Sequence, residues 1–319
     1  VSKNRRGKEV VQVYCGAPNG VLGKPAKSLA AYAKTRELAP GERQTLRFSF
    51  PAANLASYDD AGRTGHPFAW VLEPGEYPIF LGASVRDARA VGSFRISELR
   101  VVERLAEACP VPDESVAFER IAAREENGRI VPARERVPVA RRSLRARVEA
   151  GLPHAVEPTG DKGIKLIDVR RGKASLDDFI AQLSPEELAA LTRGDFKMHS
   201  PLGVPGNAAV YGGVTESLRA KGVPPVSTAD GPSGLRLDAP ASLLPVGTLL
   251  ACTWNRPLVE RLYFAFGGEI RAHNVAALLA PGMNIQSHPR CGRTFEYFSE
   301  DPLPTGRLVA HVVRGVHSA

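Results

Sequence analysis

The stretch VPPVSTAD, Val223 to Asp230, decides what kind of fold the second half of this chain adopts. It is apolar and partly β-branched, and it runs directly into the glycine-rich turn GPSG. A short apolar run that ends in a turn of this kind predicts a buried strand, as in a parallel sheet. Whether that strand belongs to a repeating β/α pattern depends on the segments on either side.

The segments that follow alternate between helical and extended patterns. Residues Asn255 to Asn274 place apolar side chains four apart, which predicts an amphipathic helix. VAALLAPGMNI, Val275 to Ile285, resembles another buried strand, and Asp301 to Ala319 resembles the helix after it. Strand, helix, strand, helix indicates a parallel α/β fold, either an open doubly wound sheet or a (β/α)8 barrel. The pattern alone leaves both open.

Two serines upstream of these segments predict helix starts. Asp178 follows Ser175 at a spacing of three, and Glu187 follows Ser184 at the same spacing, with Pro185 directly after the second serine. A serine hydroxyl and a carboxylate at this spacing can each satisfy a backbone N–H of the first turn, which is a capping box. We therefore expect a helix just after each serine.

The first hundred residues carry extended patterns. Lys8 to Cys15 is β-branched, Thr45 to Phe50 alternates apolar and polar residues, and Trp70 to Ser84 contains two extended runs around a Pro-Gly turn. Short strands with turn signals about every ten residues predict an antiparallel β-sandwich. Val1 is expected to lie close to or inside a strand, so an immunoglobulin-like sandwich would have a further strand or two before it.

Three segments are predicted from these patterns. Residues 1–104 are expected to form the β-sandwich, with its first strand or strands missing. Residues 105–161, where periodicity fades and Pro, Arg, Glu and Ala dominate, are expected to be a linker. Residues 162–319 are expected to form the α/β domain.

The charge balance permits an anionic partner but does not establish one. The 319 residues include 42 Lys and Arg against 34 Asp and Glu, a formal net charge of +8. The densest basic run, Ala133 to Ala150, is interrupted by Glu135 and Glu149 and has no aromatic residue on which a base could stack. It is interpreted as a solvated connecting segment, and no nucleic-acid partner is predicted.

Cysteine and histidine spacing predicts neither a metal site nor a disulfide framework. Cys15, Cys109, Cys252 and Cys291 stand far apart, which favours reduced, mostly buried thiols in a cytoplasmic protein. The histidines show no metal-ligand spacing, and the glycines match neither the phosphate-loop nor the dinucleotide fingerprint, so no cofactor is predicted. No run reaches the length of a membrane span and no signal peptide is visible, so no membrane partner is expected.

Asp230 and Arg236 are the first candidates for chemistry. Asp230 ends the predicted strand, and in parallel α/β folds ligands bind at the carboxyl ends of strands. A carboxylate and a guanidinium there can grip vicinal hydroxyls, one as acceptor and the other as a forked donor. The structural alternative is a turn aspartate beside a surface arginine, and the motif alone favours that alternative.

CGRTFEYFSEDP, Cys291 to Pro302, follows the other predicted strand. Arg293 could reach into a pocket while Glu296 holds its guanidinium fork. Ser299 and Asp301 are suitable caps for the helix that begins near Pro302. Glu296 and Glu300 are not interpreted as a catalytic acid and base, because nothing sets them on opposite sides of a scissile bond.

Taken together, these motifs resemble glycoside hydrolase family 3, the β-glucosidase group. The first hundred residues are similar to the fibronectin type III-like domain of many members. The segments that carry the resemblance in the second half are LDDFIAQLSPEELAAL, GGVTESLRAKGVPPVSTADGPSGLR, LPVGTLLACTWN, LLAPGMNI and CGRTFEYFSEDP. The resemblance implies that residues 162–319 are the N-terminal portion of a (β/α)8 TIM barrel, and that Asp230, Arg236 and Arg293 bind hydroxyls of the sugar in the −1 subsite.

The resemblance also implies a retaining mechanism and a rearranged domain order. In most members the barrel comes first and the fibronectin-like domain last, whereas this chain resembles a permuted subgroup with the opposite order. Family members use an aspartate nucleophile and a glutamate acid/base about 5 Å apart, and neither is expected within these residues. One local departure stands before His288-Pro289, where Ser287 replaces the usual arginine.

The leading hypothesis is a fragment of a retaining β-glucosidase-like hydrolase that binds a carbohydrate substrate and is inactive by itself. The alternative is a non-catalytic carbohydrate-binding or scaffolding protein. Glucose binding that depends on Arg293 would support a sugar site in either case.

Overall fold

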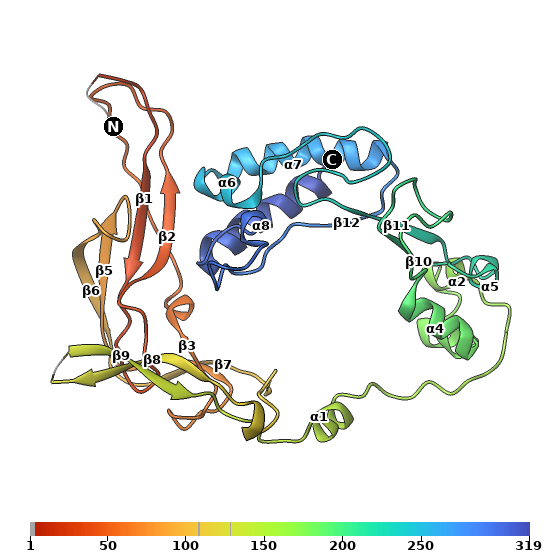
Figure 1. Ribbon diagram of the computed structural model, residues 1–319, viewed down its shortest axis with the longest axis horizontal. Helices are drawn as coiled ribbons and strands as arrows, with labels where there is room; N and C mark the ends of the chain where they lie inside the picture. The colour runs from red at the N-terminus through yellow and green to blue at the C-terminus, as the bar shows by residue number, and fades with distance from the viewer. Residues whose placement is uncertain (1–3, 108, 128) are drawn as a thin grey trace. The chain divides into compact units, whose positions relative to one another are not determined.

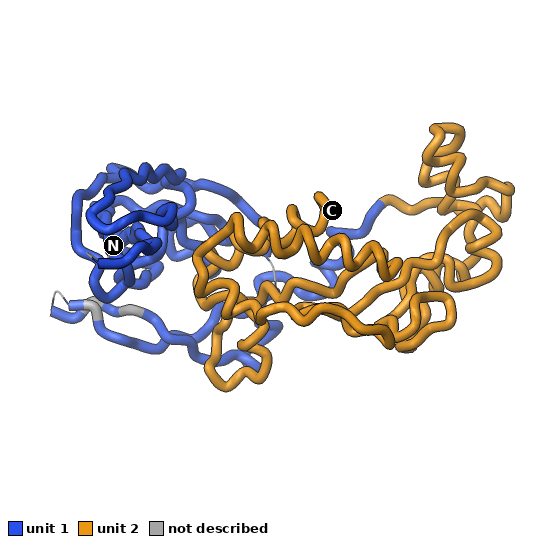
Figure 2. The backbone as a smooth tube through the Cα atoms, turned by 90° about the horizontal axis from the view of Figure 1, so that it is seen from above, with its two compact units in different colours: residues 1–153 blue, residues 154–319 orange. Residues whose placement is uncertain are grey.

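The computed structural model describes residues 4–107, 109–127 and 129–319 of the chain (Figure 1). The chain forms two compact units, unit 1 from Val1 to Pro153 and unit 2 from His154 to Ala319 (Figure 2). Val1, expected in or near a strand, lies outside the described residues.

Unit 1 is built around two antiparallel sheets, with strand orders β2-β1-β5-β6 and β3-β4-β7. Buried side chains from both sheets share one core, as the sequence predicts for a β-sandwich. The strands are β1 Val10–Cys15, β2 Ser28–Lys34, β3 Ser57–Asp59, β4 Ala69–Leu72, β5 Gly75–Gly82, β6 Arg89–Ile96 and β7 Arg100–Arg104.

The chain crosses from one sheet to the other between β4 and β5. Two residues, Glu73 and Pro74, make this connection. The Glu73 carboxylate forms a buried ion pair with Lys24 and accepts a hydrogen bond from the backbone N–H of Val21 at 2.8 Å. These partners satisfy a charge that would otherwise be costly to bury at the corner.

Thr45 to Phe50, predicted as a strand, is not a strand in the structure. Leu46, Phe48 and Phe50 are nevertheless half-buried, while the residues between them are exposed. The alternation therefore records which side chains face the apolar interior, and it does not require that a neighbouring strand pairs with this backbone.

The segment predicted as a linker carries regular structure of its own. It contains a hairpin of β8 (Glu119–Glu126) and β9 (Arg129–Arg136), followed by helix α1 (Leu144–Ala150). Arg120 of the hairpin forms ion pairs with Asp60 and Glu135. These charges tie the hairpin to the β-sandwich part of unit 1.

Unit 2 has the predicted alternation of strands and helices. Its sheet has the order β10-β11-β12, with β10 antiparallel and β12 parallel to β11. The parallel pair is joined through two helices, α6 and α7, which makes a β/α/β connection. The strands and the helices that matter for the site are β10 Ala209–Gly212, β11 Pro225–Asp230, α6 Gly247–Cys252, α7 Arg256–Ala272, β12 Ala277–Leu279 and α8 Pro302–His317.

Of the predicted helix caps of unit 2, Ser175, Ser184 and Asp301 are confirmed. Ser299 is not a helix cap, because α8 has Asp301 as its N-cap and the Ser299 hydroxyl accepts a hydrogen bond from the N–H of Asp301 at 3.1 Å. Ser175 and Ser184 each form a capping box, with Asp178 and Glu187 respectively, and begin helices α3 (Leu176–Ala181) and α4 (Pro185–Arg193). The helices α2 (Leu166–Arg170) and α5 (Glu216–Ala220) complete this part of the unit.

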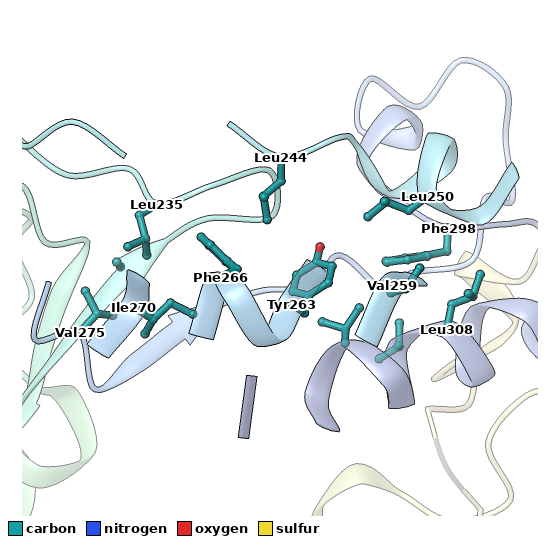
Figure 3. Close-up of a cluster of buried hydrophobic side chains, with 13 residues drawn as sticks. Leu235, Leu244, Leu250, Val259, Tyr263, Phe266, Ile270, Val275, Phe298 and Leu308 are labelled. Atoms are coloured by element: carbon teal, nitrogen blue, oxygen red, sulfur yellow. The ribbon is translucent and has the colours of Figure 1, made fainter. Parts of the chain in front are cut away.

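Helices α7 and α8 pack closely through glycine. A Cβ on Gly315 would lie 2.5 Å from the backbone oxygen of Glu260, and one on Gly267 would lie 2.8 Å from that of Val316. Beside this contact, Tyr263, Phe266 and Val259 of α7 join the largest buried apolar cluster (Figure 3). The cluster also includes Phe298, which comes from the segment that carries Arg293.

Cysteine burial differs from the prediction. Cys15 is buried, and burial raises the pKa of its thiol to about 11. Cys109, Cys252 and Cys291 are exposed free thiols, so the expectation of mostly buried cysteines was wrong. It was wrong because three of the cysteines lie in loops or at a helix end rather than on the inner face of a strand.

Even the longest of the described helices, α7, falls short of the length and apolarity that crossing a bilayer requires.

Candidate functional site

Asp230 is the last residue of β11, at the carboxyl end where β11 runs parallel to β12. The chain then turns back, and the backbone N–H of Arg236 donates to the carbonyl oxygen of Asp230 at 3.0 Å. The guanidinium Nη1 of Arg236 lies 3.3 Å from Asp230 Oδ2. Gly234, at φ +117°, allows this return in a conformation that other residues rarely adopt. The turn thus brings the two predicted residues together.

The Asp230–Arg236 ion pair is open to solvent. The side chain of Arg236 is 78% exposed and that of Asp230 is 41% exposed. An ion pair this exposed is worth only about 0–1 kcal/mol, because water screens it. Breaking this ion pair therefore costs little free energy, so each group could bind the hydroxyls of a ligand instead of its partner.

Arg293 lies just before a short 3₁₀ turn, η3 (Thr294–Glu296), between β12 and α8. Its Nε donates to Oε1 of Glu296, which confirms the predicted pairing of these two residues. The side chain of Arg293 is 69% exposed, whereas that of Glu296 is only 9% exposed. The hydrogen bond to Glu296 raises the pKa of Arg293, and the negative charge of Asp230 adds to this shift.

The three predicted residues thus share one region of unit 2. Asp230 and Arg236 are in contact. The negative charge of Asp230 also acts on Arg293, whose pKa it helps to raise. The pairing with Glu296 occupies only Nε of Arg293. The two terminal NH2 groups can then donate to a ligand.

The segment that follows η3 is anchored at two positions. Phe298 is 3% exposed and packs in the apolar cluster beside Leu250 and Val259 (Figure 3). Asp301 caps α8 by accepting a hydrogen bond from the backbone N–H of Leu303 at 2.8 Å. Burial raises the pKa of Asp301. The role of Asp301 as the N-cap of α8 explains why a carboxyl group stands at this position, and no catalytic function is needed to explain it.

Two further residues at this site were not predicted. The hydroxyl of Thr248 and the amide of Gln286 both reach backbone carbonyls of the segment Thr294–Tyr297. No local pattern could identify them, because their partners lie up to 49 residues away in the sequence. The available signal was the family-like segment LPVGTLLACTWN, which contains Thr248.

A surface hollow of about 730 Å³ lies beside the same segment. Asp230, Arg236 and Arg293 do not line it. Its lining residues are Val246, Thr248, Leu249, Cys252, Gln286, Ser287, His288, Pro289, Thr294, Phe295 and Glu300.

Within residues 4–107, 109–127 and 129–319, no three or more His, Cys, Asp or Glu side chains are grouped so as to hold a metal ion.

Two family models match the chain in separate stretches. Residues 9–85 match the fibronectin type III-like domain, and residues 177–319 match the glycosyl hydrolase family 3 N terminal domain. Residues 177–319 belong to glycoside hydrolase family 3. In this chain the fibronectin-like domain comes before the family 3 domain.

Individual relatives agree with this assignment. A Beta-glucosidase of Ruminococcus albus is 46% identical over 98% of this chain and 32% of its own length. Beta-glucosidase A of Butyrivibrio fibrisolvens is 38% identical over 98% of this chain and 39% of its own length. The crystal structure of a β-glucosidase from Paenibacillus barengoltzii covers 99% of the chain and 34% of that protein, with a TM-score of 0.91 and 46% identity. The chain therefore spans about a third of the length of these relatives.

Proposed function

We propose that this chain supplies part of the −1 sugar subsite of a retaining β-glucosidase-like hydrolase. Asp230 would accept hydrogen bonds from sugar hydroxyls, and Arg236 and Arg293 would donate to them. The observation that supports this most directly is the Asp230–Arg236 pair at the carboxyl end of β11. The negative charge of Asp230 also contributes to the raised pKa of Arg293. The similarity to proteins named β-glucosidase supports the kind of ligand.

The fold in which this subsite would be completed is a (β/α)8 barrel. The parallel pair β11 and β12, joined through α6 and α7, has the connection that such a barrel repeats. A site at the carboxyl ends of the strands is also the place where barrels of this kind bind their substrates.

The carboxylates at the site already have structural partners. Glu296 pairs with Arg293, Asp230 pairs with Arg236, and Asp301 caps α8. A retaining glycosidase needs one carboxylate as nucleophile and another as acid/base, about 5 Å apart across the scissile bond. We therefore propose that the 319 residues bind sugar without hydrolysing it.

Calorimetric titration of the chain with D-glucose tests this proposal. We expect weak binding that the Arg293→Ala variant loses, because the removed guanidinium is one of the two proposed donors to the sugar and carries two terminal NH2 groups. Arg314→Ala is the matched control, since Arg314 is an arginine of α8 with 55% side-chain exposure and pairs with Glu260 instead. A folded chain that does not bind glucose, or an Arg293→Ala variant that binds equally well, would contradict the proposal.

The same preparations should not release the chromophore from an aryl β-glucoside. Hydrolysis that persists through purification and disappears in Asp230→Ala would show that the chain is active by itself.

A further inference from the structure

The hydroxyl of Thr248 lies against the backbone of the turn that follows Arg293. Thr248 is the second residue of α6, and its Oγ1 is 3.1 Å from the carbonyl oxygens of Thr294 and Phe295 and 2.8 Å from that of Tyr297. A hydroxyl has a single proton, so these carbonyls share one donor, and the shortest distance favours Tyr297. The carbonyl oxygen of Thr294 can then take a hydrogen bond from a second donor.

Gln286 supplies that donor from the loop after β12. Its Nε2 donates to the carbonyl oxygen of Thr294 at 2.8 Å and to Thr248 Oγ1 at 3.0 Å. Its backbone N–H donates to the carbonyl oxygen of Ser299 at 3.2 Å. Gln286 therefore contacts the segment Thr294–Ser299 at both of its ends. Its Nε2 group also orients the Thr248 hydroxyl by donating to a lone pair of Oγ1.

Gly247 explains how α6 comes close enough for these hydrogen bonds. A Cβ at this position would collide with the carbonyl oxygen of Glu296 and would lie 3.2 Å from that of Tyr297. Because the colliding atoms belong to the backbone, a side-chain rotation could not relieve the contact. The first turn of α6 is thus in direct contact with η3.

From these contacts we propose that Gly247, Thr248 and Gln286 are positioning residues for Arg293. We call these three residues the turn seat. They act on Arg293 through its partner, because Glu296 belongs to η3 and moves with the backbone that the turn seat holds. This role rests on the proposed sugar-binding function.

A short 3₁₀ turn needs such support because it has few hydrogen bonds of its own. Within the turn, the N–H of Tyr297 donates to the carbonyl oxygen of Thr294 at 3.3 Å, a long distance for such a bond. Arg293, being 69% exposed, has little packing that would fix its guanidinium otherwise. A displacement of η3 would therefore carry Glu296 and the guanidinium away from Asp230.

Hydrogen exchange of the full 319-residue chain tests the first step, with Thr248→Val and Thr248→Ser as a matched pair. The valine variant keeps the shape of the side chain but loses the hydroxyl, so exchange of the peptide covering residues 294–297 should become about tenfold faster. The serine variant keeps the hydroxyl and should restore the original rate. Thr253→Val is a control, since the Thr253 hydroxyl donates to the carbonyl oxygen of Leu250 and accepts from the N–H of Asn255 at the end of α6. Equal exchange in the valine variant and the unsubstituted chain would overturn the proposal.

Calorimetry with D-glucose tests the second step on the same proteins. Thr248→Val should weaken glucose binding by about tenfold, the effect of one lost hydrogen bond, and Thr248→Ser should restore it. Faster exchange with unchanged affinity would overturn the positioning role and leave a structural contact only. If the unsubstituted chain binds no glucose, the proposed function fails and this role fails with it. If Thr248→Val does not fold, Gln286→Leu takes its place with the same two expected results.

Discussion

Arg293 and Glu296 form an ion pair whose two ends differ in exposure. The side chain of Glu296 is 9% exposed and belongs to η3, whereas the side chain of Arg293 is 69% exposed. The buried end can therefore hold the exposed end in place without using the donors that a sugar needs. For this reason, the pair is better suited to orienting the arginine than to adding stability, which solvent screening keeps small.

Replacing Glu296 with glutamine separates these two contributions. Glu296→Gln keeps the size of the side chain but removes the charge that orients Arg293. The guanidinium is then free to rotate before sugar binds, and binding must offset the entropy lost when it becomes fixed. We expect glucose affinity to fall by about 2- to 10-fold, with only a small change in melting temperature. Glu300→Gln, at an exposed carboxylate nearby, should change neither quantity. A large loss of stability without a loss of affinity would contradict the orienting role.

Residue-scale features were predictable where their partners are close in the sequence. Ser175, Ser184 and Asp301 were recognised as caps, because a cap and its helix lie within a few residues. The pairing of Glu296 with Arg293, three residues apart, was recognised for the same reason. Thr248 and Gln286 were not, because their hydrogen bonds depend on the path of the backbone between distant segments.

At the scale of elements, helices α4 and α5 are joined by a buried charge. Lys221, at the end of α5, places Nζ 2.8 Å from Glu187 of α4 and 3.1 Å from Asp161. The side chains of Lys221 and Glu187 are 10% and 6% exposed. Burial by itself would raise the pKa of Glu187, but the hydrogen bonds from Lys221 and from the N–H of Ser184 bring it below its usual value.

Removing the lysine charge should therefore destabilise unit 2 strongly. Lys221→Met leaves the Glu187 carboxylate buried without its partner, which typically costs about 3–5 kcal/mol of unfolding free energy. The double variant Lys221→Met with Glu187→Gln removes both charges and should recover much of that loss. Urea unfolding followed by circular dichroism measures both values. A single variant as stable as the unsubstituted chain would show that this pair does not support the helices.

Strands were harder to predict where the residue pattern of a segment does not match the way its backbone pairs. The β8–β9 hairpin was interpreted as a linker because its charged residues hide the extended pattern, and its partner Asp60 lies far away in the sequence. Thr45 to Phe50 was predicted as a strand from its alternation alone. The parallel pairing of β11 and β12 was anticipated from the sequence, whereas closure into a barrel involves more strands than this pattern can specify.

At the scale of the whole molecule, hydrogen bonds and ion pairs lower the pKa of carboxyl groups in both units. Asp301 is an exception, because burial raises its pKa. The carboxyls with lowered pKa are Glu42, Asp59, Asp87, Asp113, Glu135, Asp161, Asp178, Glu186, Glu187 and Glu260. The folded chain consequently binds fewer protons than the unfolded chain in the acid range.

Stability should accordingly fall in acid. A carboxyl with a lowered pKa contributes stability that is present above its unfolded value of about 4 and is lost as the pH falls through the folded value. We expect the melting temperature to change little between about pH 7 and pH 5 and to decline steeply below about pH 4. Calorimetric scans at constant ionic strength measure this. A melting temperature that stays constant down to about pH 3 would contradict the prediction.

The glycine contact between α7 and α8 limits which substitutions this region can accept during evolution. Most of the atoms in the way of a side chain at Gly315 belong to the backbone of the partner helix, so no choice of rotamer makes room for one. A second substitution on α7 could not compensate either, since a backbone has no smaller form. Descendant sequences can vary the exposed faces of both helices while Gly315 stays unchanged. It is therefore a suitable anchor point for aligning distant copies of this region.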